Sequence, residues 1–297
     1  MVSNSDKNGV KTAFLGLGVM GYPMAGHLAA NGYDVCVYNR TASKSERWVN
    51  EHNGCKAATP ADAVKDADYV FACVGNDSDV EEICCGDNGA YSGMKSGAVF
   101  VDHTTASAQI AKKLAQVAAD SGLHFIDAPV SGGQAGAENG ILTVMAGGDS
   151  SVFELVAPIM SSYGRAVTLM GPVGSGQLTK MVNQISIAGL LQGLSEALNF
   201  AAKVGLDEKL VLDVISKGAA QSWQMENRGV TMVDDQFEFG FAVDWMRKDL
   251  SICLGEANKA GARLPITALV DQFYAEIQAM GGNRWDTSSL IRLLRNP

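Results

Sequence analysis

Three glycines near the start of the chain limit the possible fold more than any other feature. Gly16, Gly18 and Gly21 are spaced as Gly-x-Gly-x-x-Gly between a short apolar run, residues 12–15, and a helical pattern over residues 19–30. In this strand–turn–helix setting the glycines permit a tight turn and let a pyrophosphate approach the amide groups that begin the helix. The pattern predicts a dinucleotide-binding domain; the alternative is a turn that is glycine-rich for structural reasons alone.

Short apolar runs alternate with helical patterns through the first half of the chain. The runs typical of buried strands lie at residues 12–15, 34–38, 69–73, 98–102, 124–128, 142–146 and 166–169. The stretch over residues 107–121 has apolar side chains at helical spacing and lies between two of these runs. Such alternation predicts an α/β domain of the Rossmann type, whose parallel sheet is covered by helices on both faces.

After residue 174 the strand pattern stops. Helical patterns cover residues 175–204, 206–217, 243–259 and 265–280. The first has about 30 residues, or about 45 Å at 1.5 Å per residue, so we expect it to join two domains. We therefore predict a dinucleotide-binding domain over residues 1–173 and an all-α domain for substrate binding and oligomerisation over residues 174–297.

Composition and charge exclude several classes of protein. The net charge of −9 gives no general attraction to nucleic acid or to an anionic membrane. No apolar run approaches the ~18–20 residues of a membrane span, and residues 1–10 lack the apolar segment of a signal peptide. The six cysteines form no Cys-x-x-Cys pair, so we expect neither a metal site nor a disulfide framework. We expect a cytoplasmic protein.

The end of the second expected strand bears on the choice of cofactor. NAD-binding domains place a carboxylate there for the ribose 2′-hydroxyl, whereas this chain has Asn39-Arg40-Thr41. Arg40 can pair with a 2′-phosphate and Thr41 can donate a hydrogen bond to it. The sequence therefore favours NADP(H), with NAD(H) still possible; the alternative is that Arg40 is a solvated loop residue.

A lysine at the start of the long helix is the candidate catalytic group. After Gly174-Ser-Gly, the residues Lys180, Asn183 and Gln184 lie at positions i, i+3 and i+4, so they share one face of the helix. A cation and two amides on an otherwise apolar helix suit a polar reacting group. Taken alone, Lys180 could equally be a solvated lysine at a helix start.

Other candidate residues follow the expected strands, where ligands of open α/β sheets bind. Ser131, Gly132 and Gly133 follow the strand at 124–128, and the glycine amides there can form a concavity that suits a substrate carboxylate. The segment at 102–105 ends the preceding strand with hydroxyl groups. Further on, Lys248-Asp249 lies in the helix at 243–259 and, taken alone, reads as a surface ion pair.

Two other patterns are misleading. Tyr91 and Lys95 have the spacing of a short-chain dehydrogenase pair, but Gly93 and Gly97 interrupt the helix that such a pair needs. The four histidines all lie in the first half, and each is expected to be a surface or packing residue. His103, which follows a strand end, is the least clear of them.

Four motifs in order resemble the β-hydroxyacid dehydrogenase family, which includes 3-hydroxyisobutyrate dehydrogenase, tartronate semialdehyde reductase and glyoxylate/succinic semialdehyde reductase. They are the glycine motif extending to Ala25, the segment 127–133 continuing to 136–148, the segment 174–184, and Lys248-Asp249-Leu250. The likeness covers nearly the whole chain after residue 10. Glutamine at position 184, where many members have asparagine, resembles the tartronate semialdehyde reductase type and leaves the substrate open.

The resemblance implies a role for each matched residue. Lys180 would be the catalytic lysine, helped by Asn183 and Gln184. The substrate carboxylate would be held by Ser131, Gly132 and Gly133, with Phe241 and Asp249 bordering the site. The cofactor-binding set would be Gly16, Leu17, Gly18, Val19, Met20, Gly21, Asn39, Arg40, Thr41, Val74, Thr105 and Lys248.

The expected activity is NADP(H)-preferring interconversion of a small β-hydroxyacid and its semialdehyde. As hydride reaches the carbonyl carbon, the Lys180 ammonium would stabilise the oxygen and deliver a proton, and burial would depress its pKa. The alternatives are an imine reductase, which generally has aspartate or tyrosine in place of this lysine, and a non-catalytic NADP-binding scaffold. A 6-phosphogluconate dehydrogenase would need a much longer helical domain. The long apolar helix predicts a homodimer or homotetramer.

Overall fold

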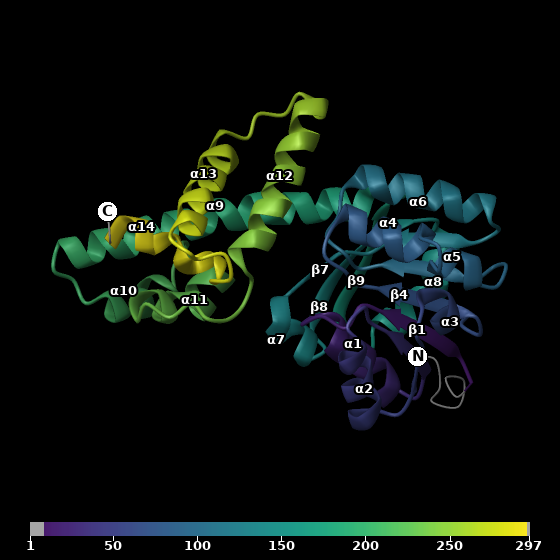
Figure 1. Cartoon of the computed structure of the whole chain (residues 1–297). Coiled ribbons are helices and arrows are strands. Elements are labelled where there is room, and N and C mark those ends of the chain that lie inside the picture. Colours follow the sequence, from purple (N-terminus) through teal and green to yellow (C-terminus); the bar gives the residue numbers. More distant parts are fainter. Residues whose placement is uncertain (1–8, 296–297) are drawn as a thin grey trace. The chain divides into compact units, whose positions relative to one another are not determined.

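The computed structural model describes residues 9–295, and the chain divides into two compact units between Lys180 and Met181 (Figure 1). The change from strands to helices occurs slightly earlier, between β9 (Gly164–Gly171) and α9 (Ser175–Lys203). The division therefore falls within the first turns of α9. The expectation about a targeting segment rests largely on residues 1–8, which lie outside the described residues.

The first unit is built on one nine-stranded sheet formed by the described residues. Its order is β3-β2-β1-β4-β5-β6-β8-β7, with β9 paired to β8. The remaining strands are β1 (Lys11–Leu15), β2 (Asp34–Tyr38), β3 (Cys55–Lys56), β4 (Tyr69–Ala72), β5 (Val99–Asp102), β6 (His124–Asp127), β7 (Val130–Ser131) and β8 (Leu142–Gly148).

The sheet is parallel from β3 to β6 but not beyond. β8 runs antiparallel to both β6 and β7, and β9 runs parallel to β8. The parallel sheet predicted from the sequence is therefore confirmed from β3 to β6, and the sheet is mixed at this end. β6 and β7 run in the same direction and are separated only by Ala128 and Pro129; the chain reverses after β7, over residues 132–141, so that β8 pairs antiparallel with both strands.

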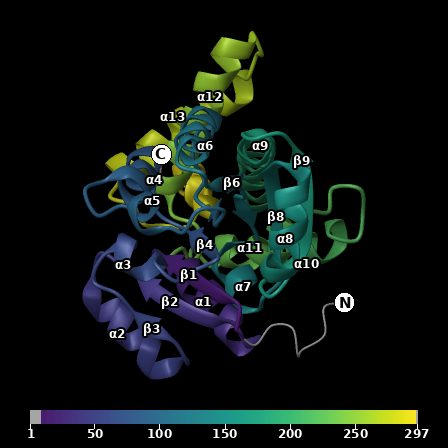
Figure 2. The ribbon, with the colours of Figure 1, turned by 90° about the vertical axis from the view of Figure 1, so that its right-hand side faces the viewer.

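Helices cover both faces of this sheet (Figure 2). Alternate side chains of β1 enter different cores, Phe14 on one face and Ala13 and Leu15 on the other, because successive residues of a strand point to opposite sides. The face of Phe14 packs against α1 (Gly21–Ala30), α2 (Ala42–Glu51), α7 (Gly133–Glu138) and α8 (Ser150–Met160). The other face packs against α3 (Pro60–Val64), α4 (Asp77–Cys85), α5 (Ala90–Gly93) and α6 (Ala108–Asp120).

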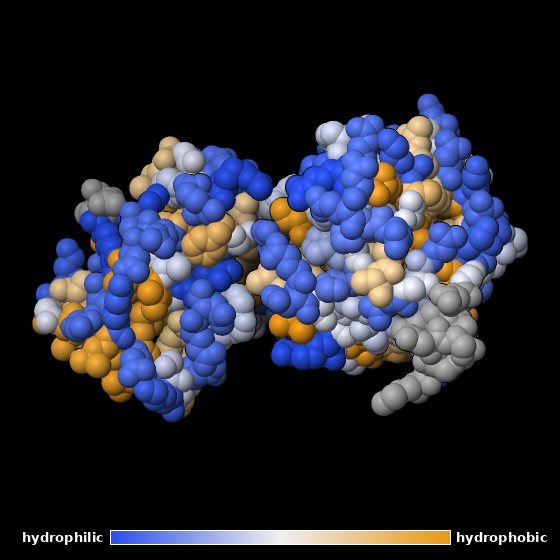
Figure 3. All heavy atoms as spheres, turned by 90° about the horizontal axis from the view of Figure 1, so that it is seen from below, coloured by the Kyte–Doolittle hydropathy of each residue, from blue (hydrophilic) through white to orange (hydrophobic). Residues whose placement is uncertain are grey.

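The second unit is helical throughout its described residues. With the greater part of α9 it comprises α10 (Glu208–Ile215), α11 (Trp223–Val233), α12 (Val243–Ala260), α13 (Pro265–Ala279), η1 (Thr287–Leu290) and α14 (Ile291–Arg295). Its main core joins Ala188 and Leu191 of α9 to apolar residues of α12 and α13. Figure 3 shows that apolar side chains also gather on the outside of this unit. No helix in residues 9–295 is long and apolar enough to cross a bilayer.

One pair of cysteines departs from the sequence-based expectation. Cys36 of β2 and Cys55 of β3 are in register on neighbouring strands, with Cα atoms 4.5 Å apart, and are joined as a disulfide. The sequence predicted no disulfide framework, and this one disulfide departs from that prediction. β3 has only two residues and no apolar pattern, so the sequence could not show that the two cysteines lie side by side.

Candidate functional site

The three glycines of the first loop have separate structural roles. Gly16 has a φ of +95°, and a Cβ there would lie 3.1 Å from a methyl carbon of Val74. A Cβ at Gly21 would lie 2.8 Å from the Phe14 ring, so Gly21 allows α1 to pack on β1. Gly18 faces open space, with nothing within 4 Å of its Cβ position. This division fits a dinucleotide, because one glycine makes the turn, one packs the helix and one leaves room for pyrophosphate.

The end of β2 lies beside this loop. The Asn39 side chain accepts a hydrogen bond from the Leu17 amide (2.8 Å), and the Tyr38 carbonyl accepts one from the Gly16 amide (2.9 Å). Asn39 therefore holds the glycine loop by a bond within the protein. Arg40 is mostly exposed, and its guanidinium lies 3.6 Å from the Asp79 carboxylate, a contact that contributes little at a surface.

The loops after β4 and β5 are joined to each other. The Val74 amide donates to the Thr104 hydroxyl (3.0 Å), while the Thr104 amide donates to the Asp102 carboxylate (2.9 Å). Thr105 is half-buried in the same loop. Both Val74 and Thr105 thus lie at the carboxyl ends of β4 and β5, the edge of the sheet that also holds the glycine loop.

His103, whose role was the least clear of the four histidines from the sequence, is a core residue. Its Nδ1 lies 2.6 Å from the Ala128 carbonyl and its Nε2 lies 2.8 Å from the Tyr163 hydroxyl. Burial lowers the pKa of His103 to about 4, so the ring is neutral at physiological pH. The pair Tyr91 and Lys95 is also separated, because α5 ends at Gly93.

The segment after β6 carries the residues that we expect to bind the substrate carboxylate. Ser131 is half-buried at the end of β7, and Gly132 and Gly133 are exposed with φ values of +131° and +61°. These left-handed conformations favour glycine, and they turn the chain from β7 into α7. Asp127, four residues before Ser131, is fully buried at the end of β6.

The amino end of α9 packs against the same edge of the sheet. The Asp127 carboxylate accepts hydrogen bonds from the amides of Gly174 (2.7 Å) and Gln177 (2.9 Å). The Gln177 side chain is bonded to the loop after β5. Lys180 follows one turn later and is only 7% exposed, so it is not the solvated lysine that a helix start often carries. The sequence analysis gave no role to Asp127 or to Gln177, although both lie within segments that it discussed. The feature that could have pointed to them is a polar side chain within an otherwise apolar stretch.

The second unit holds the other expected residues in a chain of hydrogen bonds. The Asn183 amide donates to the Gln184 carbonyl oxygen (2.8 Å), and the Gln184 amide donates to the Asp249 carboxylate (2.6 Å). The Lys248 ammonium lies 3.1 Å from the other carboxylate oxygen of Asp249. Because Asp249 is 2% exposed, the reading of Lys248-Asp249 as a surface pair is wrong. α9 and α12 hold the pair in place.

Phe241 is fixed just before α12 by a buried carboxylate. Its amide donates to Asp286 (2.9 Å), and its carbonyl oxygen accepts from the Thr287 amide (2.9 Å). Asp286 is 1% exposed and also lies 3.2 Å from the Arg228 guanidinium. The segment carrying Phe241 is therefore anchored to η1, a connection between distant parts of the sequence that no local pattern predicts.

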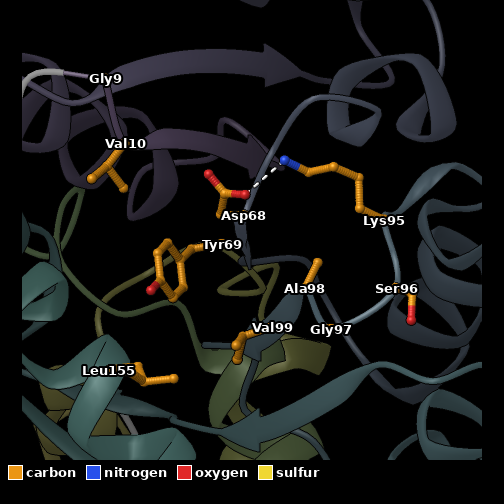
Figure 4. Close-up of a pocket in the computed structure, with 10 residues that line it drawn as sticks. All are labelled: Gly9, Val10, Asp68, Tyr69, Lys95, Ser96, Gly97, Ala98, Val99 and Leu155. Carbon is orange, nitrogen blue, oxygen red and sulfur yellow. Dashed lines mark hydrogen bonds and ion pairs between the residues drawn. The ribbon is translucent and has the colours of Figure 1, made fainter.

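A hollow in the first unit lies away from the candidate residues of that unit. It has a volume of about 460 Å³ and lies by the starts of β1, β4 and β5 (Figure 4). An ion pair between Asp68 and Lys95 (2.6 Å) lies on its wall, and Tyr69 and Leu155 also line it. The candidate residues that follow β1, β4 and β5 lie at the opposite, carboxyl ends of these strands. Within the described residues, no group of three or more His, Cys, Asp or Glu side chains is placed to hold a metal ion.

Comparisons with known proteins agree with this arrangement. Residues 11–171 match the model of the NAD binding domain of 6-phosphogluconate dehydrogenase, and residues 174–294 match that of the NAD-binding domain of NADP-dependent 3-hydroxyisobutyrate dehydrogenase. An uncharacterized oxidoreductase of Shewanella frigidimarina is 61% identical over 284 residues, which cover 96% of this chain and 98% of that protein. The 2-hydroxy-3-oxopropionate reductase of Escherichia coli is 35% identical over 285 residues, which cover 96% and 97%. Among solved structures, 3-hydroxyisobutyrate dehydrogenase of Mycobacterium tuberculosis superposes with a TM-score of 0.87 at 27% identity, covering 96% and 99% of the two chains.

Proposed function

Since the chain belongs to the β-hydroxyacid dehydrogenase family, that of 3-hydroxyisobutyrate dehydrogenase, we propose that it reduces a small semialdehyde carboxylate with NADPH and catalyses the reverse oxidation. The observation that carries this proposal is the burial of Lys180, a cation at 7% exposure on a helix anchored at the carboxyl edge of a dinucleotide-binding sheet. An ammonium group shielded from bulk water stabilises an oxygen that becomes an anion during reduction more strongly than a solvated one does.

The chain's own residues supply the proton and the orientation. A bound nicotinamide dinucleotide supplies the hydride. The Lys180 ammonium donates a hydrogen bond to the carbonyl oxygen and then its proton; in the oxidative direction neutral lysine accepts that proton. Ser131 and the amides of Gly132 and Gly133 bind the substrate carboxylate. Gln184 is bonded to Asp249 and to Asn183, and it holds the Asn183 amide in place to orient the lysine or the substrate oxygen.

Two observations at the end of β2 support NADP(H) over NAD(H). β2 ends without a carboxylate, so no negative charge opposes a 2′-phosphate at that tip. Arg40 is exposed and only weakly engaged by Asp79, and the Thr41 side chain makes no capping bond to α2. Open space at Gly18 fits the pyrophosphate that both dinucleotides share. The rest of the cofactor-binding set proposed from the sequence lies along the same edge, apart from Lys248 in the second unit.

A substrate panel tests the proposed reaction. Purified protein is mixed with NADPH and, in turn, tartronate semialdehyde, succinic semialdehyde, glyoxylate and a matched aldehyde without a carboxylate. We expect NADPH oxidation with at least one carboxylate substrate and much slower oxidation with the uncharged aldehyde, because Ser131 and the two glycines recognise the anion. Turnover that requires an added amine would indicate an imine reductase, and NADPH binding without turnover on any carbonyl would indicate a scaffold.

We also propose that the protein is a homodimer or homotetramer assembled through residues after Gly174, in a cytoplasmic setting. The second unit exposes many large apolar side chains, among them Val182, Phe200, Leu210 and Val214, each at least 60% exposed. So much apolar surface is typical of an interface between subunits. Figure 3 shows the same unit with its apolar patch.

Sedimentation velocity at micromolar concentration checks this assembly. The unaltered protein is expected to sediment as a dimer or larger species, and Phe200→Glu with Leu210→Glu is expected to shift it toward monomer, because two carboxylates would be desolvated at the interface. Leu155→Glu, at an exposed apolar position of α8 in the first unit, is the matched control and should leave the species unchanged. A monomeric parent protein would refute the proposal.

A further inference from the structure

A carboxylate and an amide, both fully buried, attach the amino end of α9 to the sheet. Asp127, at the end of β6, is 0% exposed and accepts backbone hydrogen bonds with both of its oxygens, from Gly174 at 2.7 Å and from Gln177 at 2.9 Å. The first amides of a helix have no acceptor within the helix, and a carboxylate there also interacts well with the helix dipole. Burial raises the pKa of Asp127 to about 6, against the effect of these bonds, so the group is ionised at neutral pH.

The Gln177 side chain ties the same helix to a second loop. It is 0% exposed, its amide nitrogen donates to the Thr104 carbonyl (2.7 Å), and its carbonyl oxygen accepts from the Ala106 amide (3.0 Å). These two backbone groups flank Thr105. Both the nitrogen and the oxygen of the Gln177 side-chain amide are thus bonded to the tripeptide 104–106. These two bonds fix the distance between the loop after β5 and α9.

Glycines let the helix approach closely enough for these bonds. A Cβ at Gly176 would lie 2.8 Å from the Asp127 carbonyl oxygen, and a Cβ at Gly147 would lie 2.6 Å from the Asp127 carboxylate and 2.8 Å from the Gly176 amide. Real Cβ atoms do not approach other atoms so closely. The close contacts at Gly176 and Gly147 therefore fix the position of the start of α9 on the sheet. A shift would break the buried hydrogen bonds to Asp127, and water could not replace them there.

Three segments that carry proposed site residues meet at this point. Thr105 lies between the two residues bonded to Gln177, Ser131 follows Asp127 by four residues, and Lys180 follows Gln177 by one helical turn, about 4.5 Å along the axis. We propose that Asp127 and Gln177 are positioning residues that hold Lys180 in register with the loops of Thr105 and Ser131. This inference rests on the proposed catalytic role of Lys180. Neither residue touches substrate in the proposed mechanism; each acts through Lys180.

Two variants with matched controls test the inference. Asp127→Asn leaves one of the two helix amides without its carboxylate oxygen, and Gln177→Met removes both side-chain bonds at nearly constant volume. Gln116→Met removes a side-chain hydrogen bond on the exposed face of α6, and Asp149→Asn removes the carboxylate that caps α8; neither helix carries a proposed site residue. We expect kcat to fall about 10- to 100-fold in the first pair, since a misplacement of about 1 Å can cost on the order of 10²-fold. The controls should stay within about threefold of the parent.

Two further readouts separate positioning from a merely structural role. The dissociation constant for NADPH should change less than about threefold in both variants, while hydrogen exchange at the Gly174 and Gln177 amides should become faster in Asp127→Asn. Combined with Lys180→Ala, each variant should lower kcat no further, because its effect passes through a lysine that is already absent.

The outcomes distinguish this inference from the proposed function beneath it. If Lys180→Ala abolishes turnover but Asp127→Asn and Gln177→Met keep the parent kcat, then Asp127 and Gln177 are not positioning residues. The proposed catalytic role of Lys180 is unaffected by that result. If Lys180→Ala itself keeps turnover, the proposed function fails first. A full additional loss in the double variants would show that the two residues act independently of Lys180, which also overturns the inference. Should Asp127→Asn not fold, Gln177→Met decides the matter alone.

Discussion

Replacement of Lys180 by alanine is expected to lower kcat by about 10²–10⁴-fold, the usual contribution of a general acid. The affinity for NADPH should change little, because the proposed dinucleotide contacts come from the glycine loop and Arg40 rather than from α9. Turnover and NADPH binding should be measured on the same folded preparation, with thermal unfolding as a check. Lys180→Arg should fail as well, since a guanidinium is a poor proton donor near neutral pH.

Lys203 offers a matched control for this experiment. It is an exposed lysine at the carboxyl end of the same helix, so Lys203→Ala makes an identical chemical change far along α9 from the amino-terminal anchor. We expect its kcat to equal that of the parent. If Lys180→Ala retained turnover within threefold of the parent, Lys180 would have no part in the mechanism. If it lost NADPH binding instead, the lysine would belong to the cofactor site.

The second large effect is expected for cofactor choice. The unaltered protein should use NADPH with a higher kcat/KM than NADH, and Arg40→Asp should narrow or reverse that ratio. The substitution removes a charge-assisted hydrogen bond to the 2′-phosphate, worth about 1.5–3 kcal/mol, which corresponds to about 10- to 150-fold in kcat/KM with NADPH. It also places a carboxylate where NAD-binding domains have one.

Arg165→Asp controls for the change in charge. Arg165 is exposed on β9 of the same unit, and its replacement alters the net charge equally. At a fixed ionic strength, the Arg165→Asp variant should have the same ratio of kcat/KM for NADPH and NADH as the parent. Salt screens the long-range effect of a changed surface charge, but it does not screen a direct contact between Arg40 and the 2′-phosphate to the same extent. Equal use of NADPH and NADH by the parent protein would contradict the assignment of Arg40.

Local patterns located most of the sheet. The runs at residues 34–38 and 124–128 appear almost unchanged as β2 and β6, since a buried parallel strand must be apolar along its length. β3 and β7, with two residues each, had no pattern to find. The antiparallel pairing of β8 was also missed, because strand direction depends on where the chain turns back and not on the composition of the strand.

The candidate site divides in the same way. The glycine loop, Ser131 and Lys180 could be found from spacing because each lies in a short contiguous motif. Asp127 and Gln177 could not, since an aspartate and a glutamine become functional only when folding brings them to the same helix start. Gln184 was found from its spacing to Lys180, whereas Asp249 was assigned to the site only by the likeness to a family. The hydrogen bond between them joins α9 to α12.

The sequence by itself determined the dinucleotide-binding domain, the long helix and the kinds of side chain that we propose for catalysis. These follow from the period of apolar residues and from glycines whose conformations are local properties of the backbone. Only the tertiary structure decided that Lys180 is buried and that Asp249 is not a surface residue. It also decided that a single carboxylate, Asp127, receives the first amides of α9. The burial and the hydrogen bonds of a side chain depend on which segments pack together in the folded chain. Segments that pack together are often far apart in the sequence, so local patterns do not predict them.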